Sequence, residues 1–366
     1  MRTTTEVMEL LGQSKDELRE LCGALGEPPY RGAQIYRALY AEKKFALAQI
    51  TNLPASFRSR LGQSASISFP EVKQRYLSAD GSVRYLFNLA RTAGRGTPPA
   101  AVEAVFMPSS ARQTVCVSTQ AGCAVNCQFC LTAKLGLIRN LSAGEILAQV
   151  LLPLDEHKLS LAPQTNVVFM GQGEPLLNFE AVMAAIQILQ DPQGMGISPK
   201  HVTLSTSGIV PGIEKLAQEP VRPKLAISLN ASHDEQRDEL MPINRKYPLK
   251  VLLESCRNYP LRTWEHLTFE YVMLGNVNDS AEDAKRVVRL LSPLKAVKVN
   301  LIPWNPGELP YSEAPAQRIE EFRKILVDRG VPAFVRYSRG RDVMAACGQL
   351  ALLDNCARPG LTSISM

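Results

Sequence analysis

The sequence contains no long apolar segment. Its 366 residues include no run of about 18 uncharged apolar residues, the length that a helix needs to span a bilayer, so we expect no membrane anchor. The first residues, 1–6, also lack the pattern of a cleavable signal and lead directly into an amphipathic stretch. Both absences predict a cytoplasmic protein, in which clustered cysteines are more often metal-binding or catalytic than disulfide-bonded.

Histidine is scarce, and none stands at zinc-finger spacing from the cysteines. The chain has four His and eight Cys. Three of the cysteines, Cys123, Cys127 and Cys130, follow the pattern Cys-x3-Cys-x2-Cys, with no fourth cysteine nearby. A structural zinc site normally has four N or S ligands. Three thiolates instead suit a [4Fe–4S] cluster whose fourth iron is free to bind an outside molecule. A zinc site and buried thiols remain the alternatives.

The composition allows one large α/β domain and a smaller one. The chain is 45% hydrophobic, which is enough for a sizeable core. The net charge of +6 permits an RNA partner but does not prove one, because many enzymes without such a partner carry a similar charge.

Four regions differ in their pattern. Residues 1–65 follow helical spacing and form a predicted N-terminal helical accessory domain, with Ser14 as the cap of its first helix. Residues 66–108 have a period closer to two and form a predicted β extension. Residues 109–345 form the predicted core, and residues 346–366 a C-terminal segment. Within the β extension we expect strands at Val83–Leu89 and Val102–Phe106 and a loop at Thr92–Pro99.

Strands and helices alternate in the predicted core. Repeated βα units predict an α/β fold with a parallel sheet or partial (β/α) barrel, and in such a barrel the chemistry lies on the loops that follow the strands. The cysteine segment follows the first strand. The expected strands are Thr114–Val117, Asn166–Met170, His201–Ser205, Lys224–Leu229, Leu267–Met273, Val297–Ile302 and Ala333–Tyr337. The expected helices are Ala143–Leu154, Phe179–Leu189, Gly212–Gln218, Lys250–Asn258, Ala281–Leu291 and Ala316–Arg329.

Small polar residues follow several of these strands. Gly173 and Glu174 come after the second strand, where glycine lets the backbone approach a ligand and the carboxylate can pair with an ammonium group. Ser205, Ser228–Asn230 and Asn305 stand at other strand ends, on the rim where a ligand would lie. Taken singly, each is more often part of a turn or helix cap than a ligand contact.

Five further sequence segments, considered together, indicate a family. They are Cys116–Cys123, Met170–Asn178, Leu240–Asn244, Val299–Pro303 and Ala345–Leu350. Together with the cysteine spacing they resemble the RlmN/Cfr family of radical S-adenosylmethionine (SAM) RNA methyltransferases. The likeness runs from about residue 29 to residue 350. Two residues depart from the family's usual pattern: Gln172 replaces a Met, and Asn230 replaces a His.

The resemblance implies a role for each candidate residue. The core would be a radical SAM domain of partial-barrel form, and the N-terminal helices a small RNA-binding domain. The [4Fe–4S] cluster would be held by Cys123, Cys127 and Cys130. SAM would be bound by Gly173, Glu174, Ser205, Ser228, Leu229, Asn230 and Asn305. The catalytic residues would be Cys347, which is S-methylated, Cys116, which forms a transient disulfide with it, and Glu103, a proton acceptor.

The resemblance also implies a reaction. The substrates would be an adenosine near the peptidyl transferase centre of 23S rRNA and the adenosine next to the tRNA anticodon, each methylated at C2. Two SAM molecules would be used per turnover, together with an external one-electron reductant of the flavodoxin or ferredoxin type, by a monomeric enzyme. Radical methylation suits an electron-poor ring carbon, and thiol–disulfide exchange suits release of the product.

Two rival functions remain open. A Cfr-type enzyme would methylate C8 of the same rRNA adenosine with the same catalytic residues. A non-catalytic iron–sulfur protein could bind RNA without any reaction. The presence of Cys116, Cys347 and Glu103 argues against this second rival, because binding alone needs none of them.

Overall fold

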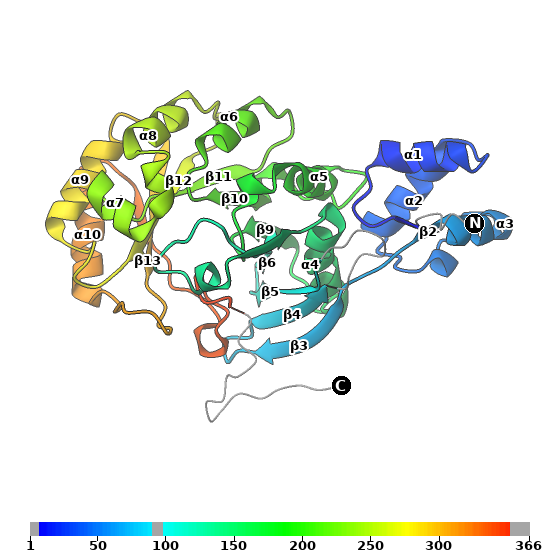
Figure 1. The fold of residues 1–366 in the computed structure, drawn as a ribbon, viewed down its shortest axis with the longest axis horizontal. Coiled ribbons are helices and arrows are strands. Elements are labelled where there is room, and N and C mark those ends of the chain that lie inside the picture. Colours follow the sequence, from blue (N-terminus) through cyan, green and yellow to red (C-terminus); the bar gives the residue numbers. More distant parts are fainter. Residues whose placement is uncertain (1–6, 90–97, 352–366) are drawn as a thin grey trace.

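The computed structural model describes residues 7–89 and 98–351. A helical unit lies at one end of the molecule, and a large sheet with its helices forms the rest (Figure 1). The expected loop at 92–99 falls almost wholly outside the described residues, as does most of the C-terminal segment 346–366. No helix in the described part of the chain has both the length and the apolar character needed to cross a membrane.

The N-terminal unit packs three helices around a small apolar core. Ser14 caps the first helix as expected: its hydroxyl accepts from the Glu17 backbone, and the Glu17 side chain accepts from the Ser14 backbone. The next helix approaches closely at Gly32, where a Cβ would lie 2.6 Å from Arg19 Cα. The elements are β1 (Met8–Glu9), α1 (Lys15–Ala24), α2 (Tyr30–Tyr40), η1 (Leu47–Gln49), α3 (Ala55–Ser64) and β2 (Ala65–Ser66).

One sheet of ten strands organises the remainder. Its spatial order is β14-β13-β12-β11-β10-β9-β6-β5-β4-β3. From β6 to β14 neighbouring strands are parallel, and from β3 to β6 they are antiparallel. The strands are β3 (Glu71–Leu77), β4 (Val83–Leu89), β5 (Ala100–Pro108), β6 (Arg112–Cys116), β9 (Gln164–Phe169), β10 (Val202–Thr206), β11 (Lys224–Ser228), β12 (Leu267–Met273), β13 (Val297–Pro303) and β14 (Ala333–Val335).

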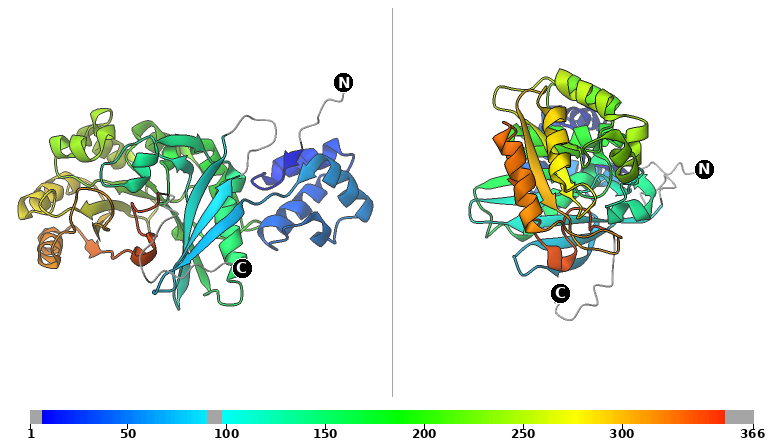
Figure 2. Two further views of the ribbon diagram at one scale, coloured as in Figure 1. Left: turned by 60° about the horizontal axis from the view of Figure 1, so that its bottom comes forward. Right: turned by 90° about the vertical axis from the view of Figure 1, so that its left-hand side faces the viewer.

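Helices connect the parallel strands and follow the curved sheet on its outer side (Figure 2). Their apolar faces share one core with alternate residues of the strands. The sheet edges β14 and β3 do not pair with each other among the described residues, so the predicted α/β class with a partial barrel is confirmed. The helices are α4 (Ala143–Glu156), α5 (Phe179–Gln190), α6 (Val210–Gln218), α7 (Asp234–Leu240), α8 (Leu249–Asn258), α9 (Ala281–Leu291) and α10 (Ala316–Asp328); short 3-10 turns lie between some of them.

Several short or polar elements were not predicted individually. β3 has only one buried residue in its seven, Tyr76, and therefore lacks a strong apolar signal. α7 has the polar sequence DEQRDEL, which gives little amphipathic pattern. The small hairpin of β7 (Gln120–Gly122) and β8 (Leu137–Asn140) encloses the cysteine segment, and strands of three and four residues are too short to show a period.

Candidate active site

A cavity opens at the carboxyl ends of the parallel strands, where the barrel rule places it. It encloses about 990 Å³ of empty space, including solvent at its mouth. Side chains at alternate strand positions face it, because successive residues of a strand point to opposite faces. Ten predicted site residues line it: Cys123, Cys127, Cys130, Gly173, Glu174, Ser205, Ser228, Asn230, Asn305 and Cys347.

The β7–β8 hairpin fixes the cysteine loop. Cys123 N–H donates to the Gly136 carbonyl at 2.9 Å. Gly122 lies in the left-handed region at φ +74°, with the Gly136 carbonyl against the position that a Cβ would occupy, so another residue there would be strained. Further along, Gln128 N–H donates to the Leu240 carbonyl at 2.9 Å, which joins the loop to the end of α7.

The three thiols of this loop share one electrostatic environment. Burial raises the pKa of Cys123 to about 11 and also raises the pKa values of Cys127 and Cys130. The neighbouring thiols raise the pKa of Cys127 further, against the nearby Arg237 guanidinium, which lowers it. Thiols with raised pKa values stay mostly protonated at neutral pH, and a bound metal favours their ionised form.

The donor set fits an iron–sulfur cluster better than a single ion. In the described part of the chain no three His, Cys, Asp or Glu side chains converge on a site suited to one metal ion. The three thiols nevertheless line one cavity. A cluster binds each thiolate through a different iron atom, so its ligands stand further apart than those of zinc.

The turn after β9 holds Glu174 at the cavity. Its carboxylate accepts from Ser207 N–H and Ser207 Oγ, both at 2.7 Å, and from Leu176 N–H at 3.0 Å. Burial raises the pKa of Glu174, and these hydrogen bonds oppose that rise. Such a carboxylate is fixed in place and can face a cationic ligand in the cavity.

The glycines of this turn serve the protein's own packing. A Cβ on Gly173, which has φ +95°, would lie 2.5 Å from Gln120 Cβ, and one on Gly171 would lie 2.7 Å from Ser118 Oγ. From sequence we attributed the glycines to close approach of a ligand. The structure gives a nearer reason, because the turn presses against the chain that leaves β6.

Gln172, in the same turn, connects it to β5. Its side-chain oxygen accepts from Glu103 N–H at 3.3 Å, and its own N–H donates to Ser118 Oγ at 2.8 Å. The sequence marked Gln172 only as a departure from a pattern. Its buried amide in fact ties the Glu174 turn to the strand that carries Glu103.

Asn230 follows β11 and lines the cavity in a strained backbone position at φ 55°. Its side-chain oxygen accepts from Val272 N–H at 2.8 Å, and its carbonyl accepts from Asn278 Nδ2 at 2.8 Å. Ser228 also lines the cavity, whereas the Leu229 side chain lies in the hydrophobic core. Of this predicted segment, two side chains out of three therefore face the cavity.

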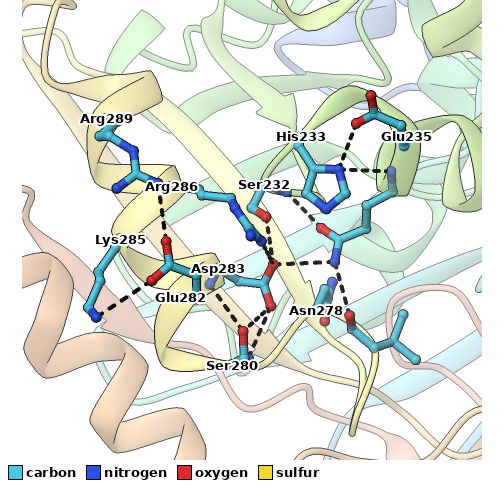
Figure 3. A network of polar contacts seen from close by, with 12 residues as sticks. Ser232, His233, Glu235, Asn278, Ser280, Glu282, Asp283, Lys285, Arg286 and Arg289 are labelled. Atoms are coloured by element: carbon cyan, nitrogen blue, oxygen red, sulfur yellow. Dashed lines mark hydrogen bonds and ion pairs between the residues drawn. The ribbon is translucent and has the colours of Figure 1, made fainter.

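A polar network behind Asn230 holds the loops after β11 and β12 together (Figure 3). Ser232 Oγ donates to Asp283 Oδ1 at 2.6 Å, and Asp283 in turn caps α9 through Ser280. Arg237 of α7 adds a second brace, since its guanidinium donates to carbonyls at the ends of β10 and β11, those of Ser207 at 2.7 Å and Ser228 at 3.0 Å. These contacts fix the strand ends that form the cavity wall.

Asn305 has an unused hydrogen-bonding atom. Its Nδ2 donates to Ser338 Oγ at 2.9 Å and to the Cys347 carbonyl at 3.1 Å. Its Oδ1 is buried and has no partner among the described residues. A buried polar atom beside a cavity indicates a missing ligand, and an amide oxygen suits a donor such as an adenine amino group.

Cys347 is held against the cysteine loop. Leu131 N–H donates to the Gly348 carbonyl at 2.8 Å, and Thr132 Oγ1 donates to the Leu350 carbonyl at 2.6 Å. Cys347 is exposed and faces the cavity, but enough protein surrounds its sulfur that burial raises its pKa to about 11. Glu270 and Cys130 raise that pKa further.

Cys116 and Glu103 share one face of the sheet. Cys116 of β6 pairs with Val105 of β5, and Glu103 lies two residues before Val105 on β5. The side chains of Cys116 and Glu103 therefore point to the same side of the sheet. The segment that carries Cys347 packs on this face through Val343, and burial raises the pKa of Cys116, with the Cys347 thiol raising it further. The two lone cysteines of the sequence are thus neighbours.

Glu103 does not line the cavity. It is fully buried and forms an ion pair with Arg84 of β4. The structure therefore places it beside Cys116 on the sheet rather than with the cofactor-facing residues. In this position a carboxylate can exchange a proton only with groups that lie over this face.

The turn between β3 and β4 clasps the chain just before Cys347. Ser78 Oγ donates to Asp342 Oδ1 at 2.6 Å, and Gly340 N–H donates to Asp80 Oδ2 at 3.0 Å. Arg339 also pairs with Asp80 at 3.4 Å. No local sequence pattern indicates this clasp, because it joins residues about 260 positions apart.

Glu270 is the main cavity residue that sequence reasoning missed. It is 8% exposed, lies in the middle of β12 and lines the cavity. Its neighbours in the sequence, Leu267–Met273, are otherwise mostly apolar. A charged residue inside an apolar strand is rarely buried without a reason, and that signal could have identified it.

Comparison with known proteins agrees with this arrangement. The family model described as the Radical SAM superfamily matches residues 117–291, and the model described as the ribosomal RNA large subunit methyltransferase N-terminal domain matches residues 8–67.

Curated relatives match most of the chain. The chain is 48% identical to a protein of Koribacter versatilis named probable dual-specificity RNA methyltransferase RlmN, over 89% of this chain and 96% of that one. It is 46% identical to the dual-specificity RNA methyltransferase RlmN of an Anaeromyxobacter species, over 92% of this chain and 88% of that one. The crystal structure of a radical SAM methyltransferase from Sphaerobacter thermophilus is 41% identical, covers 94% of this chain and 99% of its own, and superposes with a TM-score of 0.86.

Proposed function

The chain belongs to the RlmN family of radical SAM RNA methyltransferases, and from this premise we propose that it methylates C2 of adenosine. The proposed substrates are the adenosine near the peptidyl transferase centre of 23S rRNA and the adenosine next to the tRNA anticodon. The proposed route uses an S-methylated Cys347, a transient disulfide with Cys116, and two SAM molecules per turnover.

The observation that carries the proposal is the position of Cys347 between the three cysteines of the cavity and Cys116. Cys347 lies at the cavity lined by Cys123, Cys127 and Cys130, and it is also electrostatically coupled to Cys116 on the sheet face. A methyl carrier must reach its methyl donor on one side and its resolving thiol on the other. Cys347 is the only cysteine of the described residues with both neighbours.

The cluster and SAM have suitable residues. We propose that Cys123, Cys127 and Cys130 bind three irons of a [4Fe–4S] cluster, and that Glu174 and Asn305 orient SAM. When bound, this pair supplies one-electron chemistry that can activate an inert methyl group. The chain's own part is to exclude water, to hold Cys347 at the cavity, and to fix Glu174 by its three hydrogen bonds.

Release of the product is assigned to the sheet face. A thioether joining Cys347 to the RNA base must be cleaved after the carbon is added. The Cys116 thiolate attacks the Cys347 sulfur, and an S–S bond forms as the S–C bond breaks. The bonding electrons stay on the methylene carbon, which takes up a proton to become the methyl group, and an external reductant reduces the disulfide before the next turnover. Glu103 lies on the same face and is the proposed proton acceptor in this phase.

Other parts of the proposal concern partners. An external flavodoxin- or ferredoxin-type reductant supplies the electron, the enzyme acts as a monomer, and the reaction takes place in the cytoplasm, where both RNA substrates occur. The domain limits proposed from sequence, 1–65, 66–108, 109–345 and 346–366, assign RNA binding to the first. Binding by phosphate contacts should weaken steeply as salt rises, and a chain starting at residue 66, which keeps β3, β4 and β5 of the sheet, should bind RNA less tightly in a filter-binding assay.

One experiment tests the central proposal. The anaerobically reconstituted enzyme is incubated with SAM, a reductant and transcribed rRNA or tRNA fragments, and the digested nucleosides are analysed by mass spectrometry and NMR. We expect 2-methyladenosine. 8-Methyladenosine would assign the chain a Cfr-type reaction instead, and RNA binding without any methylation would reduce it to an RNA-binding protein.

A further inference from the structure

Two carboxylates line the cavity, and they differ in how they are held. Glu174 accepts three hydrogen bonds from the protein. Glu270 accepts one to its side chain, from Asn300 Nδ2 to Oε1 at 3.0 Å. Its other oxygen accepts no hydrogen bond from the described residues, and no ion pair to it occurs among them. Glu270 is thus a buried acid with a free acceptor atom at the cavity.

Burial of such a carboxylate lowers the stability of the fold, so we expect it to have a function. A buried carboxylate without a paired cation is destabilised relative to its neutral form. Burial accordingly raises the pKa of Glu270 to about 7, although the Asn300 hydrogen bond and the charges of Arg336 and Lys298 lower it. A carboxyl that exchanges its proton near neutral pH is suited to proton transfer.

The Cys347 thiol is a reactive partner within the same cavity. Both side chains line the same cavity. Burial raises the pKa of Cys347 to about 11, and Glu270 is the charged group that contributes most to this rise after burial. An ordinary cysteine thiol is mostly protonated at pH 7. A thiol must lose its proton to be a good nucleophile, so this sulfur needs a base.

The other acids near the site are already engaged. Glu174 accepts three hydrogen bonds and is assigned to SAM, and Glu103 lies on the sheet face outside the cavity, where it pairs with Arg84. The remaining charged groups that face Glu270 are Arg336 and Lys298, both cations. Among the described residues Glu270 is therefore the cavity group that is able to accept a proton from Cys347.

We propose that Glu270 accepts the proton of the Cys347 thiol as this sulfur takes a methyl group from SAM. The Cys347 sulfur forms a bond to the methyl carbon, the bond from that carbon to the sulfonium sulfur breaks, and its electron pair stays on S-adenosylhomocysteine. The thiol proton passes to the Glu270 carboxylate, so no oxidant or reductant is consumed. This inference rests on the proposed role of Cys347 as methyl carrier.

The first measurement needs neither cluster nor SAM. Cys347 of the reduced protein is alkylated with iodoacetamide across a pH series, and its peptide is quantified by mass spectrometry. Removing the negative charge in Glu270→Gln should move the midpoint for Cys347 down by about half a pH unit or more. Glu174→Gln is the matched control in the same cavity and should leave that midpoint in place. An unmoved midpoint in Glu270→Gln would show that this carboxylate is not beside the thiol and would overturn the proposal.

The second measurement is the rate of S-methylation of Cys347 in a single turnover of reconstituted enzyme. At pH 7 Glu270→Gln should be about 100-fold slower than wild type, although its thiol ionises more readily, and its rate should keep rising with pH. The wild-type rate should level off above neutral pH. An equal rate in the two proteins would overturn the base role, whereas a wild type that forms no S-methylcysteine would overturn the proposed function instead.

A second variant covers the case in which Glu270→Gln fails to fold. Asn300→Ala keeps the acid but removes its hydrogen bond, so the pKa of Glu270 should rise. The midpoint of the methylation pH profile should move up while the limiting rate at high pH is retained. A profile identical to wild type would contradict the proposal.

Discussion

The parallel and antiparallel halves of the sheet perform different tasks. In the parallel half, from β6 to β14, functional side chains stand at strand ends around one cavity. In the antiparallel half, from β3 to β5, the contribution comes from a strand face with Glu103 and from a turn that clasps the Cys347 segment. β6 belongs to both, because it pairs parallel with β9 and antiparallel with β5, and it carries Cys116 at its end.

The difference teaches where each kind of chemistry can be placed. Strand ends of a parallel sheet converge, so they can surround a bound group from several directions. A flat antiparallel face offers fewer directions but can support a segment that lies across it. Cys347 is held between the two, and its environment combines a cavity residue, Glu270, with a sheet residue, Cys116.

The largest effect is expected from the parallel half. Cys123→Ala, Cys127→Ala and Cys130→Ala should each abolish the cluster, because three thiolates are the fewest that can hold it here. Iron and sulfide content after anaerobic reconstitution should fall close to zero. A full complement of iron in any one of these variants would exclude that residue as a ligand.

Substitutions of Cys347 and Cys116, the two cysteines at the boundary, should distinguish the roles of the two halves of the sheet. Cys347→Ala should remove methylation entirely, because no other group can carry the methyl carbon. Cys116→Ala should still form S-methyl-Cys347 and add to RNA, but nothing then cleaves the thioether. This variant should accumulate a nuclease-sensitive protein–RNA adduct on a denaturing gel. Normal turnover by Cys116→Ala would mean that Cys116 only fills space in the core.

Glu174→Gln should have an intermediate effect within the parallel half. The amide keeps the size of the side chain but loses the charge that faces the SAM ammonium group, so SAM should bind about 10- to 100-fold more weakly. Iron content should stay normal because Glu174 is not a cluster ligand. Equilibrium dialysis with labelled SAM measures the change, and unchanged affinity would assign Glu174 to the fold alone.

The smallest effect is expected from the clasp in the antiparallel half. Burial raises the pKa of Asp80, but hydrogen bonds from Ser82 and Gly340 outweigh it and hold the pKa below its ordinary value of 3.8; Asp342 is lowered in the same direction by Ser78. Because these values are depressed in the folded state, the clasp contributes stability above pH 3.8 and loses it as pH falls. The protection of the amides in residues 339–345, measured as exchange relative to the intrinsic rate at each pH, should therefore fall in acid, and Asp80→Asn should show lower protection already at neutral pH. Equal exchange in the variant and wild type would show that the clasp does not restrain this segment.

Much of the fold could be predicted because its signals are local. β4 and β12 begin and end at the predicted residues, and α9 does as well, since each has a clear apolar period. Short polar elements were missed: α7 is held by the buried side chain of Arg237 rather than by an apolar face. Pairing of the antiparallel strands with β6 depends on contacts that no local pattern encodes.

The site residues likewise divide into those that a local sequence pattern predicts and those that it does not. Cysteine spacing marks the proposed cluster loop, because a bound cluster imposes close spacing along the chain. The glycine-containing turn after β9 also marks the cavity, although its glycines serve packing within the protein. Glu270 was not predicted, since its meaning lies in what it faces and not in its sequence neighbours. The proximity of Cys116 to Cys347 followed only from family resemblance, and 231 positions separate them in the chain. The roles of these residues stay predictions until the variants are measured.

The hydrogen bonds that join the Cys347 segment to the cysteine loop have a thermodynamic consequence. Leu131 and Thr132 follow the last cluster ligand directly, and both donate to the backbone just after Cys347. If the three cysteines bind a metal as proposed, filling that site and holding residues 347–350 in place are coupled equilibria, and coupling is reciprocal: each event favours the other by the same free energy. A chain starved of iron would then hold the Cys347 thiol less firmly at the cavity.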